Sequence, residues 1–196
     1  MKILIYLFIS SLFVACSNYR NEPTFLNLTL GMDEAAAKDS IKSLIANDLI
    51  EKDLNEYIYI FNKYDPDRMV YADLTFYYDF GILSKVAVSL GHLDRYVSGT
   101  KFVSECITKE EVNFVYELYQ LKYGEPEEVC DECMMFWDDL KNIDILFSKG
   151  YKNAYTCDTS LYLMGAAIYY EIPQSELDKL EKKEKEKAEK DELNSI

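Results

Sequence analysis

The chain has 196 residues, of which 21 are Lys or Arg and 35 are Asp or Glu, so its formal net charge at pH 7 is −14. A surface this acidic repels phosphate backbones, which argues against nucleic acid as a partner. Hydrophobic residues make up 49% and aromatic residues 14% of the chain, which is ample material for a core. The 17 tyrosines and 10 phenylalanines favour strands, because aromatic side chains pack well on a pleated sheet.

Residues 1–15 have the parts of a secretory signal peptide. Lys2 is the only charge, an apolar or hydroxyl run follows from Ile3 to Val14, and the small residue Ala15 comes next. A helix needs about 20 apolar residues to span a bilayer, so this shorter run predicts an export signal that is removed.

The end of the signal resembles the lipobox of bacterial lipoproteins. It reads Phe13-Val14-Ala15-Cys16, with Phe13 where leucine is usual. The resemblance implies cleavage before Cys16 and lipid attachment on that cysteine, which would tether the protein to a membrane of the cell envelope on the periplasmic or surface side. The alternative is an ordinary signal peptide that happens to precede a cysteine.

A polar tether over residues 16–27 leads to a helix and then to three strands. Asp33 is a candidate N-cap, and apolar residues at helical spacing predict a helix from Glu34 to about Leu49. Strands are predicted over 56–62, 69–78 and 82–90, the second by strict alternation of apolar and polar residues. These strands should form an antiparallel meander.

The same order of elements then repeats. Residues 91–105 read as a connection, and Thr108 and Glu111 fit a capping box that starts a helix from Lys109 to about Lys122. Gly124 ends that helix, and strands are predicted over 133–137, 143–147 and 159–170, the last long enough to bend or to be two strands. The sequence therefore predicts an α+β domain over 28–172, built from two similar halves of a helix and three strands, 28–95 and 105–172.

Residues 173–196 are almost entirely Glu, Lys and Asp after Pro173, and Glu181 and Lys185 are four residues apart in the favourable orientation. They predict a solvated, charged C-terminal helix. Leu177 and Leu180 are its contacts with the body, and heptad apolar positions for a coiled coil are missing.

Four cysteines follow Cys16 in the chain: Cys106, Cys130, Cys133 and Cys157. An even number in an exported protein favours disulfides, and the sequence leaves their pairing open. A redox role for the Cys130/Cys133 motif is disfavoured, because Asp131 and Glu132 between the two cysteines should raise the thiol pKa.

No metal site is predicted. Zinc could take Cys130 and Cys133 with Cys157 and either Cys106 or His92, but the usual second pair of closely spaced ligands is missing. Asp138, Asp139 and Asp144 could attract calcium, yet they lack the alternating-oxygen loop with its glycine and closing Glu, so a solvated hairpin turn is the simpler interpretation.

No catalytic residue and no cofactor are predicted either. His92 is the only histidine, and a Gly-x-Ser-x-Gly nucleophile motif is missing from the sequence. We therefore interpret His92 as a surface-loop residue, and a hydrolase is a distant alternative.

The tyrosines of the first meander are the candidate binding surface. If Ile58 and Ile60 face the core, Tyr57 and Tyr59 face the other way, and Tyr71 and Tyr77 of the next strand join them. Such a face suits recognition, since tyrosine gives a large contact area at low entropy cost. The alternative is that helices cover this face.

Two stretches carry a resemblance to known envelope proteins. LTLGMDEAAAKDSIKSLI, with its Leu30-Gly31-Met32 step, and VYELYQLKYGEPEE resemble small Bacteroidetes lipoproteins, with a domain similar to the SmpA/OmlA type and to β-lactamase-inhibitory protein. The resemblance implies helices packed on an antiparallel sheet, and an envelope protein as the partner. Asp39-Ser40-Ile41 resembles an O-glycosylation signal of exported Bacteroidetes proteins.

These features predict a lipid-anchored envelope protein that binds a protein or surface ligand without catalysis. The alternative is an accessory lipoprotein of an outer-membrane assembly or nutrient-uptake complex.

Overall fold

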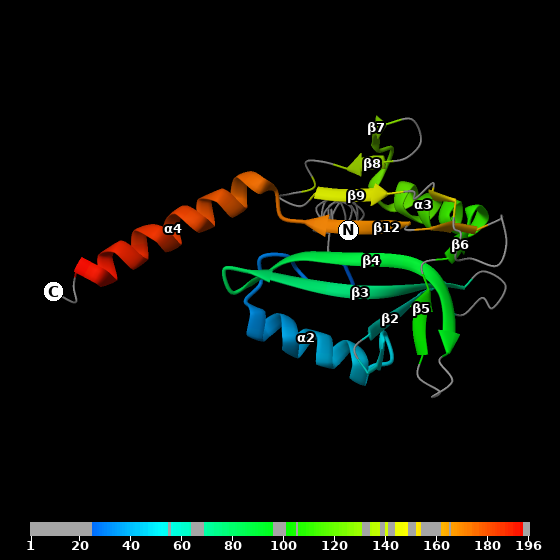
Figure 1. Cartoon of the computed structure of the whole chain (residues 1–196), viewed down its shortest axis with the longest axis horizontal. Helices are drawn as coiled ribbons and strands as arrows, with labels where there is room; N and C mark the ends of the chain where they lie inside the picture. The colour runs from blue at the N-terminus through cyan, green and yellow to red at the C-terminus, as the bar shows by residue number, and fades with distance from the viewer. Residues whose placement is uncertain are drawn as a thin grey trace, which may run out of the picture.

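The computed structural model describes residues 25–54, 56–63, 69–95, 101–104, 106–130, 134–137, 140, 144–148, 152–153, 162–164 and 166–193 (Figure 1). Its described helices are α2 (Glu34–Ala46), α3 (Lys109–Tyr123) and α4 (Gln174–Leu193). Its described strands are β1 (Glu51–Asp53), β2 (Glu56–Phe61), β3 (Val70–Asp79), β4 (Ile82–Arg95), β5 (Lys101–Ser104), β6 (Cys106–Thr108), β7 (Glu127–Cys130), β8 (Met134–Trp137), β9 (Asp144–Ser148), β10 (Lys152–Asn153), β11 (Tyr162–Met164) and β12 (Ala167–Glu171). The predicted α+β class is confirmed. The predicted signal peptide and Cys16 lie outside the described residues.

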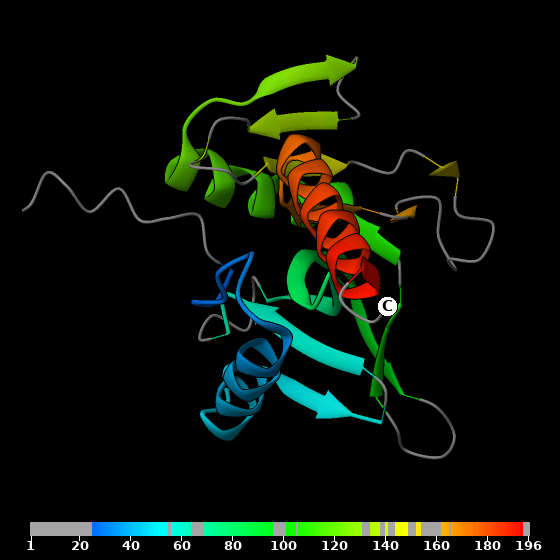
Figure 2. The same ribbon diagram turned by 90° about the vertical axis from the view of Figure 1, so that its left-hand side faces the viewer.

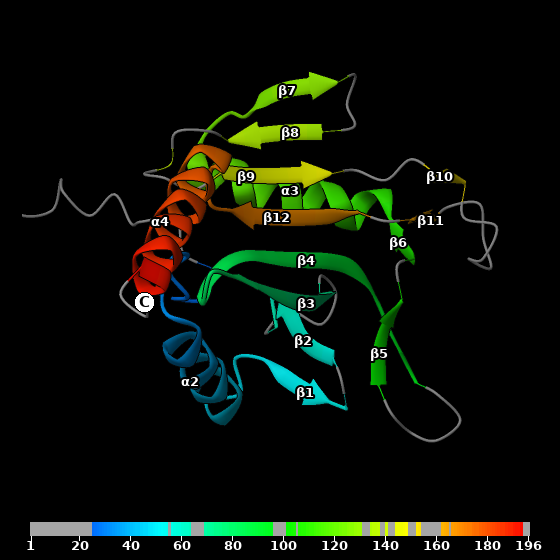
Figure 3. The same cartoon turned by 60° about the vertical axis from the view of Figure 1, so that its left-hand side comes forward.

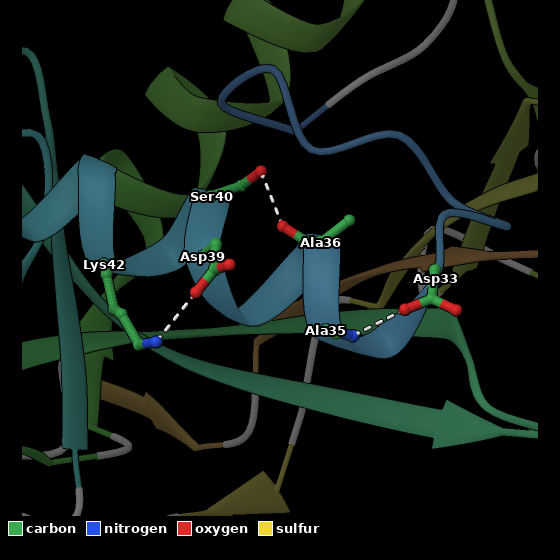
Figure 4. A network of polar contacts seen from close by, with 6 residues as sticks. All are labelled: Asp33, Ala35, Ala36, Asp39, Ser40 and Lys42. Atoms are coloured by element: carbon green, nitrogen blue, oxygen red, sulfur yellow. Dashed lines mark hydrogen bonds and ion pairs between the residues drawn. The ribbon is translucent and has the colours of Figure 1, made fainter.

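Local sequence signals start α2 and α3 where they were predicted. The Asp33 carboxylate accepts a hydrogen bond of 2.9 Å from the backbone N–H of Ala35 at the start of α2 (Figure 4). At the start of α3, the Thr108 hydroxyl accepts from the Glu111 N–H at 3.2 Å, and the Glu111 carboxylate accepts from the Thr108 N–H at 2.9 Å. This reciprocal capping box satisfies backbone donors that have no partner within the helix.

Nine of the described strands form one antiparallel sheet. Its order is β1-β2-β3-β4-β12-β9-β8-β7, with β5 paired to β4 (Figure 3). The predicted meander β2-β3-β4 is confirmed, and β12 joins it to the later strands by pairing with both β4 and β9. A second described sheet contains β10, β11 and β6.

The connection predicted over 91–105 is wrong for the described part of that segment. β4 continues to Arg95, and its end pairs with β5 from His92↔Ser104 to Arg95↔Lys101. Polar residues at His92 and Asp94 interrupt the apolar alternation, but pairing between the two strands still satisfies the backbone. Of the two alternatives for 159–170, a bent strand or two strands, the structure has two, β11 and β12, the second of which ends at Glu171.

Both α2 and α3 cover the same face of the sheet (Figure 2). Their buried residues join one hydrophobic core with alternate residues of the central strands; the largest fully buried members include Phe147, Leu74, Leu90, Ile145 and Ile168. Phe25 already lies in this core, with its ring 5.5 Å from that of Tyr59 and 5.2 Å from that of Tyr170. Phe25, which the sequence placed in the tether, thus packs in the core.

The opposite face carries β5 at one end and the start of α4 at the other. The backbone N–H of Lys101 donates to Asp53, and that of Val103 donates to Glu56. The first turns of α4 are half-buried at Leu177 and Leu180, as predicted, while residues 181–191 are exposed and project away from the sheet (Figure 1). None of the described helices is long and apolar enough to cross a membrane.

Candidate functional site

The register of β2 and β3 separates the four tyrosines that the sequence placed on one face. Tyr59 pairs with Ala72, and Ile60 pairs with Tyr71, so Tyr59 and Tyr71 point to opposite faces. Tyr57 shares the face of Tyr59 and packs against the helix-covered core, whereas Tyr77 shares the other face with Tyr71. The expected single tyrosine surface is therefore wrong. The prediction assumed that Ile58 faces the core under the helices, but Ile58 is buried on the face away from α2.

The cysteine predictions fall mostly outside the described residues. Cys106 lies in β6. Cys133, Cys157 and the side chain of Cys130 lie outside what the structure describes. The pairing of the cysteines thus stays a prediction, which alkylation of the exported protein without reduction would test.

His92 belongs to a strand and not to a surface loop, which corrects the prediction. It lies in β4, and its Nε2 atom is 3.3 Å from the Glu111 carboxylate at the start of α3. Strand and helix thus meet at a half-buried contact between His92 and Glu111.

A cleft of about 450 Å³ lies between α2 and the second half of β3, and we call it the α2–β3 cleft. Lys38, Ile41, Lys42 and Ile45 line its helix side. Their spacing of three and four residues places them on one strip of α2. The helix therefore presents two aliphatic side chains and two ammonium groups to the same cleft.

The strand side and the end of the cleft are rich in aromatic rings. The rings of Tyr57 and Phe76 meet edge to face with their centroids 5.4 Å apart. Lys52 lies with its Nζ atom 5.2 Å from the Tyr57 centroid, and Lys38 with its Nζ atom 5.5 Å from the centroid of Tyr78. Burial raises the pKa of the Tyr78 phenol, and this effect exceeds the lowering of the pKa by the Lys38 charge. The hydroxyl is therefore neutral at neutral pH and can donate a hydrogen bond.

The two cleft lysines on α2 form only weak ion pairs within that helix. Lys38 pairs with Glu34, and Lys42 pairs with Asp39 at 2.7 Å; the two lysine side chains are 56% and 75% exposed (Figure 4 shows Lys42 and Asp39). Exposed pairs of this kind contribute about 0.2–1 kcal/mol each. A ligand carboxylate can therefore replace these partners at little cost.

Asp73 is the last residue of β3 that pairs with β2. Burial raises the pKa of its carboxyl, although the nearby backbone N–H groups of Tyr57 and Leu74 act in the opposite direction. The β2–β3 pairing stops at Ile58↔Asp73, while β3 itself runs on to Asp79.

A second cleft of about 300 Å³ lies under the first turns of α4, next to Lys85, Phe136, Leu146 and Leu177. Its lysine is already engaged: Lys85 pairs with Glu171 at 2.6 Å and lies 4.5 Å from the centroid of Tyr169. The α2–β3 cleft, with three lysines in its lining, is the stronger candidate for binding an anionic group.

Sequence reasoning missed the α2–β3 cleft, although one signal was present. The predicted strand over 56–62 is shorter than its predicted neighbour over 69–78, so part of the longer strand had to lack a partner on that side. Ser40, in the predicted glycosylation signal, lies within α2, where its hydroxyl donates to the Ala36 carbonyl at 2.9 Å (Figure 4). Modification at Ser40 would have to break this bond.

No known protein family, curated protein or solved structure matches this chain. The resemblance to small envelope lipoproteins stays a prediction, and the function has to be argued from the residues of the α2–β3 cleft.

Proposed function

We propose that this chain is a lipid-anchored binding protein of the bacterial cell envelope that recognises an anionic protein or surface ligand without transforming it. The observation that carries the proposal is the α2–β3 cleft, which gathers Lys38, Lys42 and Lys52 over an aromatic floor. The chain as a whole carries a formal charge of −14, so three cations in one cleft are a local departure from its acidic surface.

The groups that line the cleft suit binding. Ammonium groups attract carboxylates or phosphates, and the rings of Tyr57 and Phe76 offer apolar contact area beside them. An anionic ligand with an apolar part would satisfy both features. The acidic surface elsewhere would repel the same ligand, which favours this site over others.

The envelope location rests on the sequence. The export signal and Cys16 support attachment of the mature chain to a membrane through lipid. An accessory role in an outer-membrane assembly or nutrient-uptake complex is the alternative, with a membrane complex as the partner.

We also infer that the domain consists of two similar halves. The sheet order supports this, since β2-β3-β4 and β8-β9-β12 each place their last strand at the centre, where β4 pairs with β12. One helix precedes each set of strands in the chain, and both helices cover the same face.

The proposal is tested by charge reversal in the cleft. A Lys38→Glu/Lys52→Glu double variant and the wild type are used to capture partners from solubilised envelope of the source bacterium, with quantitative detection. We expect the double variant to lose the species that the wild type captures, because two attractive charges become repulsive.

Lys179→Glu/Lys183→Glu on α4 is the matched control, since it makes the same charge change away from the cleft. Equal capture by the wild type and the cleft variant would contradict the proposal. Stoichiometric capture of a fixed membrane complex would favour the accessory role.

A further inference from the structure

The second half of β3 is an open strand edge inside the α2–β3 cleft. β3 pairs with β4 up to Asp79, whereas its pairing with β2 covers only residues 70–73. Among the described residues, 74–79 therefore have a strand partner on one side and none on the other. Backbone donors and acceptors on such an edge are a template for another extended chain.

The end of β2 fixes where an added strand would lie. Because the β2–β3 pairing ends at Ile58↔Asp73, residues 56 and 57 of β2 have no partner on β3. β2 then leads back to β1 through the pair Asp53↔Glu56, away from the remainder of β3. An added segment would occupy the position that a longer β2 would have filled.

α2 lies along this open edge, so an added strand would be held on two sides. Leu74, Thr75 and Phe76 line the cleft from β3, and Ile41 and Ile45 line it from the helix. In an extended segment, every second side chain would point to the helix-covered face. Those side chains would meet the aliphatic residues of α2 and the ring of Phe76.

The charged side chains of the cleft determine which kind of peptide segment can bind. Lys38 and Lys42 come from α2, and Lys52 comes from β1, where it shares a face with its pair Tyr57. The ammonium groups thus approach the site from two elements. A segment with carboxylate side chains among apolar ones fits this arrangement, whereas a basic segment would be repelled.

We propose that the α2–β3 cleft binds an extended, acidic peptide segment of another protein, which adds to β3 at residues 74–79 as a further strand. This inference rests on the binding function proposed above and names its ligand class. Main-chain hydrogen bonds to β3 supply affinity, and the lysines and the aromatic floor supply selectivity.

The probe is a display library of random twelve-residue peptides, selected on the full-length wild-type protein, with the Lys38→Glu/Lys52→Glu variant as counter-selection. The selected peptides should be acidic with alternating apolar residues. Their affinity for the double variant should fall by at least about tenfold. Lys179→Glu/Lys183→Glu should bind them as the wild type does.

Two further measurements distinguish strand addition from other modes of binding. Amide hydrogen exchange of residues 74–79 should slow when a selected peptide binds. N-methylation of alternate peptide backbone nitrogens should abolish binding in one of the two registers, because it removes the N–H groups that face β3.

Selection of basic or helical peptides, or of none, would overturn the inference, as would unchanged exchange at residues 74–79. If the protein instead forms a dimer that the same charge reversal disrupts, a second copy is the occupant and the inference fails. If charge reversal abolishes capture of the envelope partner while exchange at 74–79 stays unchanged on peptide binding, the proposed binding function stands and strand addition falls.

Discussion

Gly124 is a residue at which backbone conformation, and not packing, determines the amino acid. Its φ of 88° and ψ of −166° lie in a region that is essentially restricted to glycine. A Cβ atom there would meet nothing within 4 Å, so a side chain would be strained without being crowded. The Gly124 carbonyl also accepts a hydrogen bond of 2.8 Å from the indole of the buried Trp137.

Gly124→Ala should therefore lower the free energy of unfolding by about 1–3 kcal/mol, the usual cost of such backbone strain. Urea unfolding followed by far-UV circular dichroism measures this. The exposed neighbour provides a control, since Glu125→Ala should change stability by less than about 0.5 kcal/mol. Equal stability of Gly124→Ala and wild type would show that the turn relaxes to another conformation.

Glu111 joins the start of α3 to β4 through its charge. Burial alone would raise its pKa, but the His92 imidazole 3.3 Å away and hydrogen bonds from the side chain and backbone of Thr108 together hold the pKa below its usual value. A carboxyl whose pKa is lower in the folded state stabilises the fold above its unfolded pKa. That contribution is lost as the pH falls through the folded-state pKa.

The substitution Glu111→Gln removes the charge and keeps a polar side chain, so it tests how stability depends on the protonation of Glu111. Relative to Glu111→Gln, the wild type should lose stability as the pH is lowered from about 7 to about 3, because the Glu111 carboxylate takes up a proton over this range. Urea unfolding at a series of pH values gives the difference between the two proteins. A difference that stays constant over the series would mean that the Glu111 charge does not stabilise the fold.

At the scale of elements, α4 consists of two parts with different surroundings. Leu177 lines the small cleft beside Phe136 and Ile172, so the first turns rest on the sheet. Beyond Leu180 the described residues up to 191 are exposed, and Glu181 pairs with Lys185 at 2.6 Å along the helix. Contacts of this kind support a helix locally and add little to the stability of the domain.

A chain ending at Leu180 should therefore unfold within about 0.5 kcal/mol of the full chain. Leu177→Ala should cost about 1 kcal/mol, since it removes apolar area from a half-buried site. Thermal and urea unfolding of both variants provide the measurement. A large loss of stability on truncation would show that the distal part of α4 contacts the body.

Continuous strand pairing connects the early and late strands of the nine-stranded sheet. The pairing of β4 with β12 joins the early strands to the late ones, and a core shared by α2 and α3 covers one face. The proposed role of this body requires that it be held at a membrane, and we propose that lipid on Cys16 holds it there.

Cys16→Ala should move the protein from the membrane fraction to the soluble fraction of the envelope. Three acyl chains anchor a protein effectively permanently, and without them no comparable apolar anchor is predicted. Immunoblotting of fractionated cells measures the distribution, and Ser17→Ala, which keeps the lipid cysteine, is the control. Membrane attachment of the Cys16 variant at the wild-type level would contradict the lipid anchor.

Much of the fold could be predicted from local patterns. Asp33 and the Thr108/Glu111 box gave the helix starts, and alternation along β3 gave the central strand, because these signals act between residues close in the chain. The extension of β4 to Arg95 could not be predicted, since it depends on pairing with β5. The burial of Phe25 depends on Tyr59 and Tyr170, which are distant in sequence.

The candidate site likewise combines features that the sequence predicts with features that depend on contacts between distant residues. The sequence by itself determined the acidic charge, the helices and most strands, since each follows from composition or from short-range periodicity, whereas the export signal with Cys16 stays a prediction. Only the tertiary structure decided which tyrosines share a face and where β3 lacks a partner. Both depend on the register between β2 and β3, where a shift of one residue moves every side chain to the other face.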